Sequence, residues 1–352
     1  MRAQWCTMEQ WYKRIISGEA AGLVPALVRY VLAAVALFYG LSVRLRNMAY
    51  DAGWKKVVKL PVPVISVGNL TTGGTGKTPT VIMIVQDLVK LGRKPAVLTR
   101  GYKASQNGVS DEVLVIQEEC PGVPVIINQD RVAGGRQAIE KFSADVLVLD
   151  DGYQHRRLAR DLNLLLVDAT SPMGIPGLLP AGSWREPPSG MRRADAIMLT
   201  RCEQVTPQLA DMAAGLLTEW RSPRVIFQQH TRVVGLFNAQ GQRVSPIPGR
   251  VLAFAGIANP EGFVRTLESI HMTVASGCWY GDHHHYDVKR DTARLNEIAQ
   301  SCNVAALVTT LKDWVKLRGA ESILPIYHVR IASQVAGPEA ANWMEKLIDT
   351  MK

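Results

Sequence analysis

Short apolar runs alternate with longer amphipathic stretches along the chain after Trp54. The short runs are rich in β-branched residues and carry few polar positions, a pattern typical of parallel strands that are buried on both faces. We expect strands at Val62–Val67, Pro95–Thr99, Glu112–Ile116, Val123–Ile127, Val146–Leu149, Leu162–Val167 and Ala196–Leu199. The longer stretches predict helices at Pro79–Leu91, Arg131–Phe142 and Pro207–Trp220. This alternation predicts an α/β fold with a parallel sheet and helices on both faces.

A second, shorter set of alternating elements follows. Residues Val225–Val244 have the pattern of paired strands that link the two sets. Beyond them we expect strands at Val251–Phe254, Thr273–Ser276 and Ala305–Thr309, with helices from Pro260, over Val288–Cys302 and from Pro338. The sequence therefore predicts a main domain over residues 51–224, linker strands over 225–249 and a smaller C-terminal α/β domain over 250–352, after an N-terminal helical segment over 1–50.

The N-terminal segment contains an apolar stretch from Ala26 to Val43 in which Arg29 is the only charged residue. Its length is close to the roughly 20 residues that a membrane-spanning helix needs. A buried core helix is the alternative. A cleaved signal peptide fits poorly, because the stretch begins deep in the chain and no small-residue cleavage pattern follows it. We favour a membrane-associating helix whose basic C-terminal flank faces anionic headgroups on the cytoplasmic side.

A glycine-rich loop joins the strand that ends near Val67 to the helix that begins near Pro79. In such a loop the glycines turn backbone N–H groups onto phosphate oxygens, the lysine reaches the β- and γ-phosphates, and the last hydroxyl reaches Mg²⁺. The candidate residues are Thr71, Thr72, Gly73, Gly74, Thr75, Gly76, Lys77 and Thr78. Thr71 stands where the common pattern has glycine, but the strand–loop–helix context is the required one. The loop predicts a P-loop NTPase-like site for a nucleoside triphosphate.

Two pairs of acidic residues are candidates for chemistry at this site. Asp150 and Asp151 follow the strand Val146–Leu149, at the sheet edge where ligands bind in parallel α/β folds. They predict Mg²⁺ binding together with Thr78, although a capping role is the alternative for aspartate at such a position. The second pair, Asp111 and Glu112, taken alone has the pattern of turn residues before a strand.

Three consecutive histidines, His283 to His285, lie in a polar stretch beside Asp282. Neighbouring side chains diverge in any regular element, so the three cannot all face one metal ion, and no zinc-like ligand spacing accompanies them. A solvated polar loop and a loop with one functional histidine both remain open. An adjacent carboxylate would orient such a histidine as a base.

The composition narrows the partners only slightly. The 352 residues carry a formal net charge of +9, which favours acidic ligands such as nucleotides, anionic lipids or phosphorylated substrates. No recognisable nucleic-acid-binding module accompanies the charge, so we expect no nucleic-acid partner. The five cysteines are odd in number and none has C-x-x-C spacing, which argues against a disulfide framework and favours a reducing compartment.

Taken together, the motifs resemble one family closely, the tetraacyldisaccharide 4'-kinases, which are the lipid A precursor kinases of Gram-negative bacteria. The matching stretches run along nearly the whole chain and include GNLTTGGTGKTP, SDEVLVI, NQDRVAGG, VLVLDDGYQHRRL, LLPAGSWREP, FAGIANPEGF, GDHHHY and VTTLKDWVKL. The resemblance implies transfer of the γ-phosphoryl group of ATP, with Mg²⁺, to the 4'-hydroxyl of a tetraacyldisaccharide 1-phosphate, giving lipid IVA. It also implies a location at the cytoplasmic face of the inner membrane, on the membrane surface. We expect a monomer.

The resemblance also implies roles for individual residues. Asp111 and His283 match the acid/base pair of the family, and Lys77 matches its phosphate-loop lysine. Glu112, Asp150 and Asp151 match carboxylates around the metal, while Arg131, His155, Arg185 and Glu186 match positions linked with the substrate headgroup. Since Asp111 and His283 fall in different predicted domains, we expect domain closure to bring them together.

Three features depart from the family pattern. The loop between Tyr102 and Asp111 is shorter than in the family, its acidic motif reads SDEV where GDEP is commoner, and Leu311 stands where glutamate is usual. The alternative function is that of a membrane-associated P-loop ATPase or nucleotide switch with a protein partner. The loop around His283 and the stretch LPAGSWREP argue against this alternative, since a switch has no need of them.

Overall fold

The chain forms two compact units in the computed structural model, which describes residues 8–101, 110–218, 225–245, 247, 249–257 and 259–349. The first unit comprises Met1–Arg100, Ile126–His230 and Val335–Lys352, and the second comprises Gly101–Val125 and Thr231–Gln334. This division differs from the expected order of domains, because the segment around Asp111 belongs to the second unit. The shortened loop that precedes Asp111 covers residues 102–109 and lies outside the described residues.

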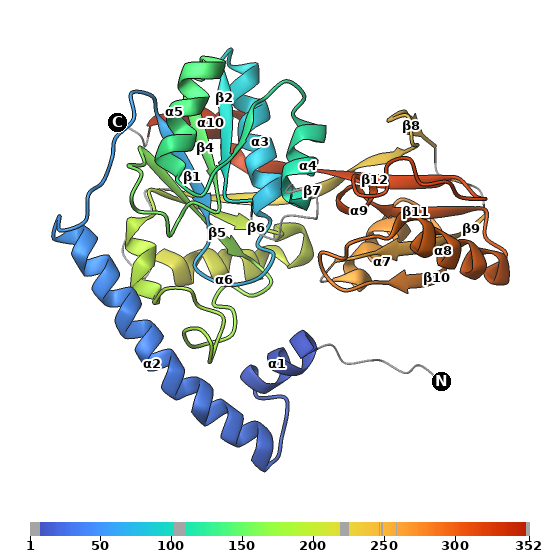
Figure 1. Ribbon diagram of the computed structural model, residues 1–352, viewed down its shortest axis with the longest axis horizontal. Coiled ribbons are helices and arrows are strands. Elements are labelled where there is room, and N and C mark those ends of the chain that lie inside the picture. Colours follow the sequence, from blue (N-terminus) through green and yellow to red (C-terminus); the bar gives the residue numbers. More distant parts are fainter. Residues whose placement is uncertain are drawn as a thin grey trace. The chain divides into compact units, whose positions relative to one another are not determined.

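The first unit is built on a parallel sheet (Figure 1). The strand order is β7-β6-β5-β1-β4-β2-β3. Their bounds are β1 Val64–Gly68, β2 Pro95–Thr99, β3 Val125–Ile127, β4 Val146–Asp150, β5 Leu162–Asp168, β6 Ala196–Thr200 and β7 Val225–Phe237, of which the first residues pair with β6. Every residue of β1, β2, β4 and β6 is buried, as the near-continuous apolar runs predict.

Helices cover both faces of this sheet. The helices of the unit's main body are α3 Lys77–Lys90, α5 Arg131–Phe142, α6 Pro207–Thr218 and α10 Trp343–Asp349, with 3₁₀ turns η1 Pro188–Arg193, η2 Cys202–Gln204 and η3 Pro338–Ala341. Val132 and Ala138 of α5 pack with Val64 and Leu147 on one face. Successive side chains of a strand point to opposite faces of the sheet. Because the strands are buried on both faces, the other face must also be covered, and α3 packs against β1, β2 and β4. The predicted P-loop NTPase-like fold is confirmed.

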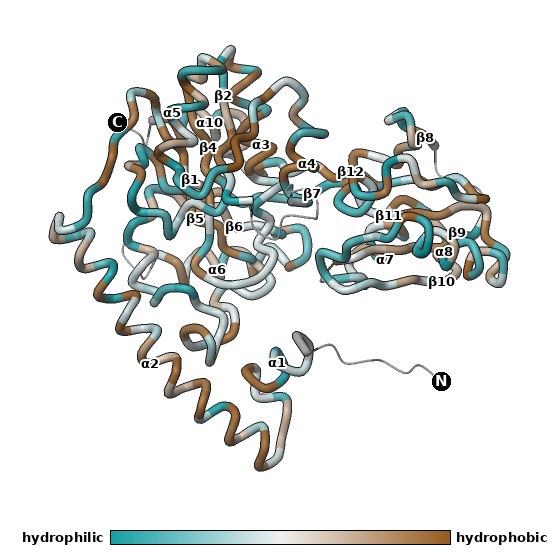
Figure 2. Tube along the Cα trace, viewed as in Figure 1, coloured by the Kyte–Doolittle hydropathy of each residue, from teal (hydrophilic) through white to brown (hydrophobic). Residues whose placement is uncertain are grey.

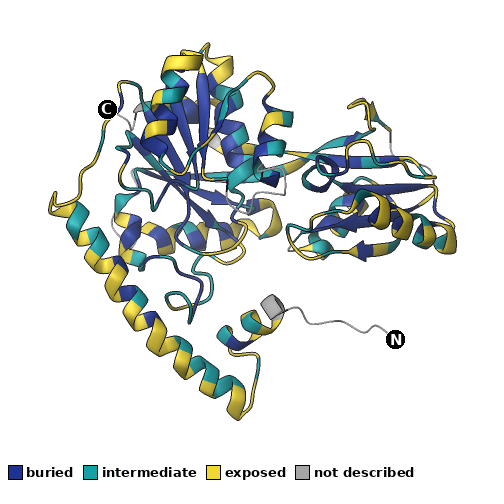
Figure 3. Cartoon of the chain, viewed as in Figure 1, coloured by how far each residue is buried: buried dark blue, intermediate teal, exposed yellow. Residues whose placement is uncertain are grey.

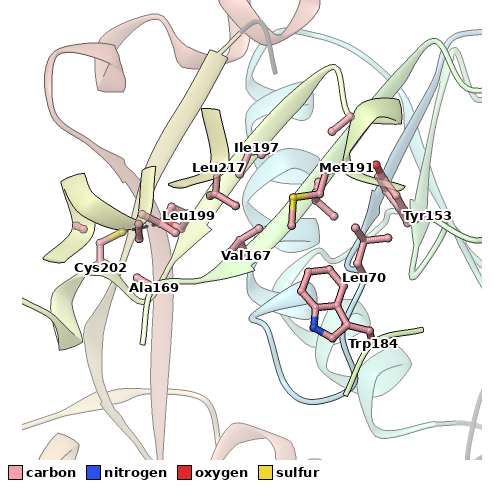
Figure 4. Packing of buried hydrophobic residues seen from close by; sticks show 14 residues of the cluster. Leu70, Tyr153, Val167, Ala169, Trp184, Met191, Ile197, Leu199, Cys202 and Leu217 are labelled. Carbon is pink, nitrogen blue, oxygen red and sulfur yellow. Dashed lines mark hydrogen bonds between the residues drawn. The ribbon is translucent and has the colours of Figure 1, made fainter. Parts of the chain in front are cut away.

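A buried apolar cluster supports the edge of the sheet where the strands end. Figure 4 shows Val167 of β5 and Leu199 of β6 in this cluster, together with Leu217 of α6. The same cluster includes Leu70, just after β1, and Trp184 in the stretch LPAGSWREP. Its packing therefore holds two loops that are distant in sequence against the same strand ends.

The second unit has its own parallel strands, in the order β10-β9-β11-β12. The elements are α4 Asp111–Glu119, β8 Arg243–Val244, β9 Arg250–Ala255, α7 Pro260–Ser269, β10 Thr273–Trp279, α8 Val288–Cys302, β11 Ala306–Thr310, α9 Leu311–Trp314 and β12 Ile326–Ala336. The strand β8 pairs antiparallel with the end of β7, which confirms the predicted paired strands. Leu311 is buried in the core of this unit, so the residue that departs from the family pattern serves packing.

One predicted strand is wrong. The run Glu112–Ile116 belongs to helix α4, which begins at Asp111 after Ser110 in the N-cap position. Two acidic residues in the first turn suit the positive end of the helix dipole, and Val113 and Ile116, three residues apart, form its buried side. The short apolar run has the composition of a strand, and only these flanking residues indicate a helix.

The C-terminal helix belongs to the first unit, although the sequence places it in the smaller domain. Its Trp343 packs edge-to-face on Phe227, with ring centroids 5.9 Å apart. The Trp343 indole also donates a 3.0 Å hydrogen bond to Asp87 of α3. Trp343 therefore anchors the helix to the first unit, together with the buried Met344 and Leu347.

The N-terminal segment forms two helices, α1 Met8–Ile16 and α2 Leu23–Asp51. Among the described residues, α2 is the one helix long and apolar enough to cross a membrane, and only 11% of its most apolar window is buried. Figure 2 shows its hydrophobic character and Figure 3 its exposure. The alternative of a buried core helix is therefore wrong. The exposed apolar side chains are Leu23, Val24, Leu27, Tyr30, Val31, Val35, Leu37, Phe38, Leu41, Leu45 and Met48.

A narrow stripe of α2 attaches the helix to the first unit. The buried residues of the helix are Ala36, Gly40 and Val43, and a Cβ at Gly40 would lie 2.7 Å from a methyl carbon of Leu178. The Tyr39 hydroxyl donates a 2.8 Å hydrogen bond to the carbonyl oxygen of Arg185. Most of the apolar surface of α2 thus faces away from the protein.

A buried histidine, His328 of β12, is stacked between two aromatic rings in the second unit. The ring centroids of His328 and Trp314 are 5.3 Å apart with an interplanar angle of 2°, and Phe237 stacks at 5.9 Å. Burial, and after it the charges of Arg330 and Arg318, lower the pKa of His328 to about 3. The imidazole is therefore neutral in the folded protein at neutral pH.

Acidification is expected to destabilise the second unit through His328. The ordinary pKa of histidine is 6.5, so the unfolded chain binds the proton first and the free energy of unfolding falls as the pH drops from 6.5 towards 3. By pH 5 this linkage amounts to about 2 kcal/mol. His328→Phe keeps the aromatic stack and removes the titration, so urea unfolding at several pH values should show a flatter dependence below 6.5. An unchanged slope in the variant would count against this origin.

Candidate active site

The phosphate loop connects β1 to α3 in the first unit, as predicted. Gly73 has φ of 116° and Gly76, the N-cap of α3, has φ of 77°. Both lie in the region that favours glycine, which explains why these two positions carry it. The first N–H groups of α3 have no helical partner, and the helix dipole favours an anion there. The local geometry is that of a site for a phosphate group.

Lys77, the first residue of α3, reaches back over the loop. Its Nζ lies 3.2 Å from Oδ1 of Asn69 and 3.7 Å from Oδ1 of Asp151. The buried Asn69 also donates a 2.7 Å hydrogen bond to the carbonyl oxygen of Thr71. Asn69 therefore orients both the lysine and the start of the loop, a role that sequence reasoning missed. Its position directly after the buried strand was the available signal.

The two strand-end carboxylates lie at the same edge of the sheet as the loop. Asp150 ends β4 and pairs in register with Val67 of β1. The guanidinium of Arg185 donates to both carboxylate oxygens of Asp151, at 3.0 and 2.9 Å. Burial alone would raise the pKa of the Asp151 carboxyl, but the charges of Lys77 and Arg185 outweigh it and hold this pKa below its usual range. Asp151 is therefore ionised at neutral pH.

The turn after β4 depends on glycine. Asp151 has a left-handed φ of 52°, which aspartate tolerates better than most residues. A Cβ on Gly152 would lie 2.7 Å from Cβ of Leu149 and 2.7 Å from Oγ of Ser66. The turn DDG therefore needs glycine at its third position, where no side chain would fit.

Arg131 lies close enough to these carboxylates to interact with their charges, and His155 in turn lies near Arg131. Arg131 is buried at the start of α5 and donates a 2.5 Å hydrogen bond to the carbonyl oxygen of Asn128. Burial lowers the pKa of Arg131, and the charge of Asp150 partly offsets it. Burial, followed by the charges of Arg131 and Arg160, lowers the pKa of His155 to about 4. His155 is therefore neutral at neutral pH, and its buried Nε2 has no hydrogen-bond partner among the described residues.

Glu186, which the resemblance links with the substrate headgroup, is fully buried. Its carboxylate accepts hydrogen bonds from Arg46 at 3.0 Å, Asn47 at 2.8 Å and Arg193 at 2.8 Å. Arg46 and Asn47 belong to α2. The contacts of Glu186 therefore connect the N-terminal helix to the body of the first unit.

The second unit holds Asp111 and His283 in direct contact. Nδ1 of His283 lies 3.1 Å from Oδ2 of Asp111, and Nε2 lies 3.8 Å from Oε1 of Glu112. Asp111 is almost fully buried at the start of α4. The expectation that domain closure brings the pair together is wrong, because both residues belong to one compact unit and are already paired.

A buried lysine, Lys316, completes this cluster and was missed by sequence reasoning. Its Nζ lies 3.2 Å from Oδ2 of Asp111, 3.2 Å from Oδ1 of Asp313 and 3.1 Å from the carbonyl oxygen of His284. Burial alone would raise the pKa of the Asp111 carboxyl, but the hydrogen bond to His283 and the charge of Lys316 outweigh it and lower this pKa. The stretch KDWVK, within a motif quoted for the resemblance, was the available signal.

The donor set in the first unit suits ATP and Mg²⁺. Thr78, Asp150 and Asp151 offer hard oxygen atoms around the phosphate loop, and Mg²⁺ is commonly held by one or two carboxylates together with substrate phosphates. Among the residues that the structure describes, no group of three or more His, Cys, Asp or Glu side chains could hold a metal by itself.

Known proteins resemble the chain over nearly its whole length. The model of the family described as tetraacyldisaccharide-1-P 4'-kinase matches residues 28–350. A tetraacyldisaccharide 4'-kinase of Syntrophus aciditrophicus is 40% identical over 335 residues, covering 87% of this chain and 89% of the relative. That of Geobacter sulfurreducens is 38% identical over 336 residues, covering 90% and 92%.

A solved structure agrees with this grouping. The crystal structure of LpxK from Aquifex aeolicus in complex with ATP has a TM-score of 0.73 and 32% sequence identity, and the match covers 92% of this chain and 99% of that one. The phosphate loop, the strand-end carboxylates and these matches lead to one conclusion: the chain belongs to the tetraacyldisaccharide-1-phosphate 4'-kinase family.

Proposed function

We propose that this protein transfers the γ-phosphoryl group of ATP to the 4'-hydroxyl of a tetraacyldisaccharide 1-phosphate, the glycolipid precursor of lipid A. The observation that carries the proposal is the arrangement of Lys77, Asp150 and Asp151 around the phosphate loop, in a chain of this family. Phosphoryl transfer needs positioning and charge neutralisation rather than covalent catalysis. The alternative of a nucleotide switch explains neither the family membership nor the paired Asp111 and His283.

Thr78, Asp150 and Asp151 would hold Mg²⁺, and the resemblance adds Glu112 to these ligands. The metal, when bound with ATP, supplies neutralisation of the phosphate charge. Arg185 would keep Asp151 oriented through its two hydrogen bonds, at 3.0 and 2.9 Å. Lys77 would move from Asn69 and Asp151 to the β- and γ-phosphates.

Asp111 and His283 would activate the acceptor hydroxyl. In this proposal Asp111 accepts the proton of the 4'-hydroxyl, and His283 assists through its hydrogen bond to the carboxylate. The lowered pKa of Asp111 keeps the carboxylate ionised at neutral pH and ready to accept the proton. A loose phosphoryl-transfer transition state makes only a modest demand on basicity, so a weak base suffices.

Arg131, His155 and Arg185 would contact the phosphorylated headgroup of the acceptor. Two of them are cationic, and the neutral His155 offers a buried ring nitrogen that has no hydrogen-bond partner among the described residues. Glu186, the fourth residue that the resemblance assigns to the headgroup, would act through the position of α2, because its carboxylate is enclosed by Arg46, Asn47 and Arg193.

Glu186→Gln is expected to lower the free energy of unfolding of the first unit by about 3 kcal/mol, because it removes the fully buried carboxylate that pairs with the half-buried Arg46 and Arg193. Chemical denaturation checks this change. Glu140→Gln, which removes an exposed carboxylate from α5, is the control and should leave stability unchanged. Wild-type stability of Glu186→Gln with a raised KM for the glycolipid would instead indicate direct contact with the headgroup.

The exposed apolar side of α2 supports association with the membrane surface. A glycolipid acceptor resides in a membrane and ATP in the cytosol, so we place the enzyme at the cytoplasmic face of the inner membrane. The phosphate loop, its lysine and the strand-end carboxylates come from a single chain, so this site needs no residue of a second subunit, and we propose that the enzyme acts as a monomer.

The deciding experiment is a kinase assay with the purified full-length chain in detergent. It supplies γ-labelled ATP, Mg²⁺ and tetraacyldisaccharide 1-phosphate. Label should appear in the glycolipid, and the transfer should stop when Mg²⁺ is chelated. ATP hydrolysis that ignores the glycolipid but rises with a protein partner would establish the nucleotide switch instead.

A further inference from the structure

Thr200, the last residue of β6, and Arg201, which follows it, contact carbonyl oxygens of the phosphate loop. The Thr200 hydroxyl lies 3.1 Å from the carbonyl oxygen of Thr75. The Arg201 guanidinium donates to the carbonyl oxygen of Gly74 through Nη2. Neither residue belongs to the phosphate-loop motif, and neither has a role in the proposed chemistry.

The contacts act on the peptide planes of the loop. The carbonyl of one residue and the N–H of the next share a rigid plane and point in opposite directions. A donor that holds the carbonyl of Thr75 therefore aims the N–H of Gly76 the other way, and a donor on Gly74 does the same for the N–H of Thr75. That N–H now lies 3.2 Å from the carbonyl oxygen of Gly73, a long contact that a phosphate oxygen can replace.

Both supporting side chains are themselves held in place. Thr200 is fully buried, and the single proton of its hydroxyl is shared between the carbonyl oxygens of Thr75 and Val167, at 3.1 and 3.2 Å. Arg201 Nη1 forms a 2.5 Å ion pair with Asp168, at the end of β5. Arg201 has a left-handed φ of 59°, which is uncommon for a residue other than glycine and requires support from its surroundings.

We propose that Thr200 and Arg201 are positioning residues for nucleotide binding, which hold the peptide planes of Gly74 and Thr75 so that the loop's N–H groups face the triphosphate. Asp168 anchors the arginine. The inference rests on the nucleotide-binding part of the proposed function and is independent of the acceptor. The phosphate-loop motif itself involves only β1 and α3, and the proposal adds a contribution from the end of β6.

The test measures binding of ATP with Mg²⁺ by calorimetry, in the full-length chain and without glycolipid. Arg201→Met and Thr200→Val should each weaken binding by about tenfold, the scale expected for one lost hydrogen bond to a charged or buried group. Thr200→Ser keeps the hydroxyl and should restore affinity. Arg201→Lys should restore it only in part, because an ammonium cannot reach Asp168 and Gly74 as a fork does. In the kinase assay, KM for the glycolipid should not change.

A matched control lies at the opposite end of the same sheet. Arg93 pairs with Asp145 at 3.1 Å, with both side chains near the starts of β2 and β4. Arg93→Met removes an arginine of similar exposure from an Arg–Asp pair without touching the loop. It should leave the dissociation constant for ATP unchanged.

Each outcome decides the proposal. Wild-type affinity in both Arg201→Met and Thr200→Val would overturn it, and so would lowered thermal stability with unchanged affinity. Weak binding in Arg201→Met alone would indicate direct contact with the nucleotide and would also overturn it. If Arg201→Met and Thr200→Val fail to fold, the two conservative variants decide. Wild-type affinity for ATP in Thr200→Ser with weaker binding in Arg201→Lys supports the proposal, and wild-type affinity in both overturns it. A wild-type protein that binds no ATP would refute the proposed function itself.

Discussion

Lys77→Ala is expected to lower the rate of phosphoryl transfer by about 10³-fold, the scale seen when a key electrostatic contact to the transition state is removed. Lys77 is the cation of the phosphate loop, 3.2 Å from Asn69 and 3.7 Å from Asp151. Without it, the charge that builds on the transferred phosphoryl group loses a main compensating group. The kinase assay with labelled ATP and tetraacyldisaccharide 1-phosphate measures the change.

The control for Lys77→Ala is a lysine on the same helix. Lys90 lies in the last turn of α3 and pairs with Asp87 at 2.7 Å, with 73% of its side chain exposed. Lys90→Ala removes the same charge far along the helix and should keep wild-type activity. Retention of more than about a tenth of the activity in Lys77→Ala would contradict the role of this lysine in catalysis.

Asp111→Asn is the second change with a large expected effect. It removes the proposed proton acceptor at nearly constant volume, so kcat should fall by about 10²- to 10⁴-fold, the usual range for a general base. The dissociation constant for ATP should not change, because the loop and its lysine belong to the first unit. Rate and binding measurements together test both parts of this expectation.

The control for Asp111→Asn separates catalysis from stability. Lys316 pairs with Asp111 and Asp313 at the same distance of 3.2 Å, and both carboxylates are buried. Asp313→Asn therefore disturbs the same lysine but not the contact with His283. Equal losses of activity in the two variants would mean that Asp111 only stabilises the second unit.

The contact between Asp111 and His283 changes how the mechanism is described. Sequence order separates these residues by 172 positions and suggested that they meet only on closure. In the structure α4 packs on α9 within the second unit, and Lys316, two residues beyond the end of α9, contacts Asp111. The pair is thus preformed within one unit.

Local pattern was sufficient for several features. Buried strands such as Pro95–Thr99 are apolar on both faces, and the helix Arg131–Phe142 begins after an aspartate cap. The phosphate loop was evident because glycine, lysine and threonine occur in the one order that a strand–loop–helix site requires. The family resemblance is likewise a property of sequence alone, and the family match confirms it.

Tertiary structure decided what depends on contacts between distant segments. It packed α4 against α9, placed the last helix in the first unit and paired Asp111 with His283. It also enclosed Glu186 among residues of α2 and brought Thr200 and Arg201 against the phosphate loop. Sequence by itself determined the elements and the motif, because these follow from short-range periodicity and backbone conformation. Only packing over long sequence separations determined which charged groups meet and which lose water, and therefore which of them can do chemistry.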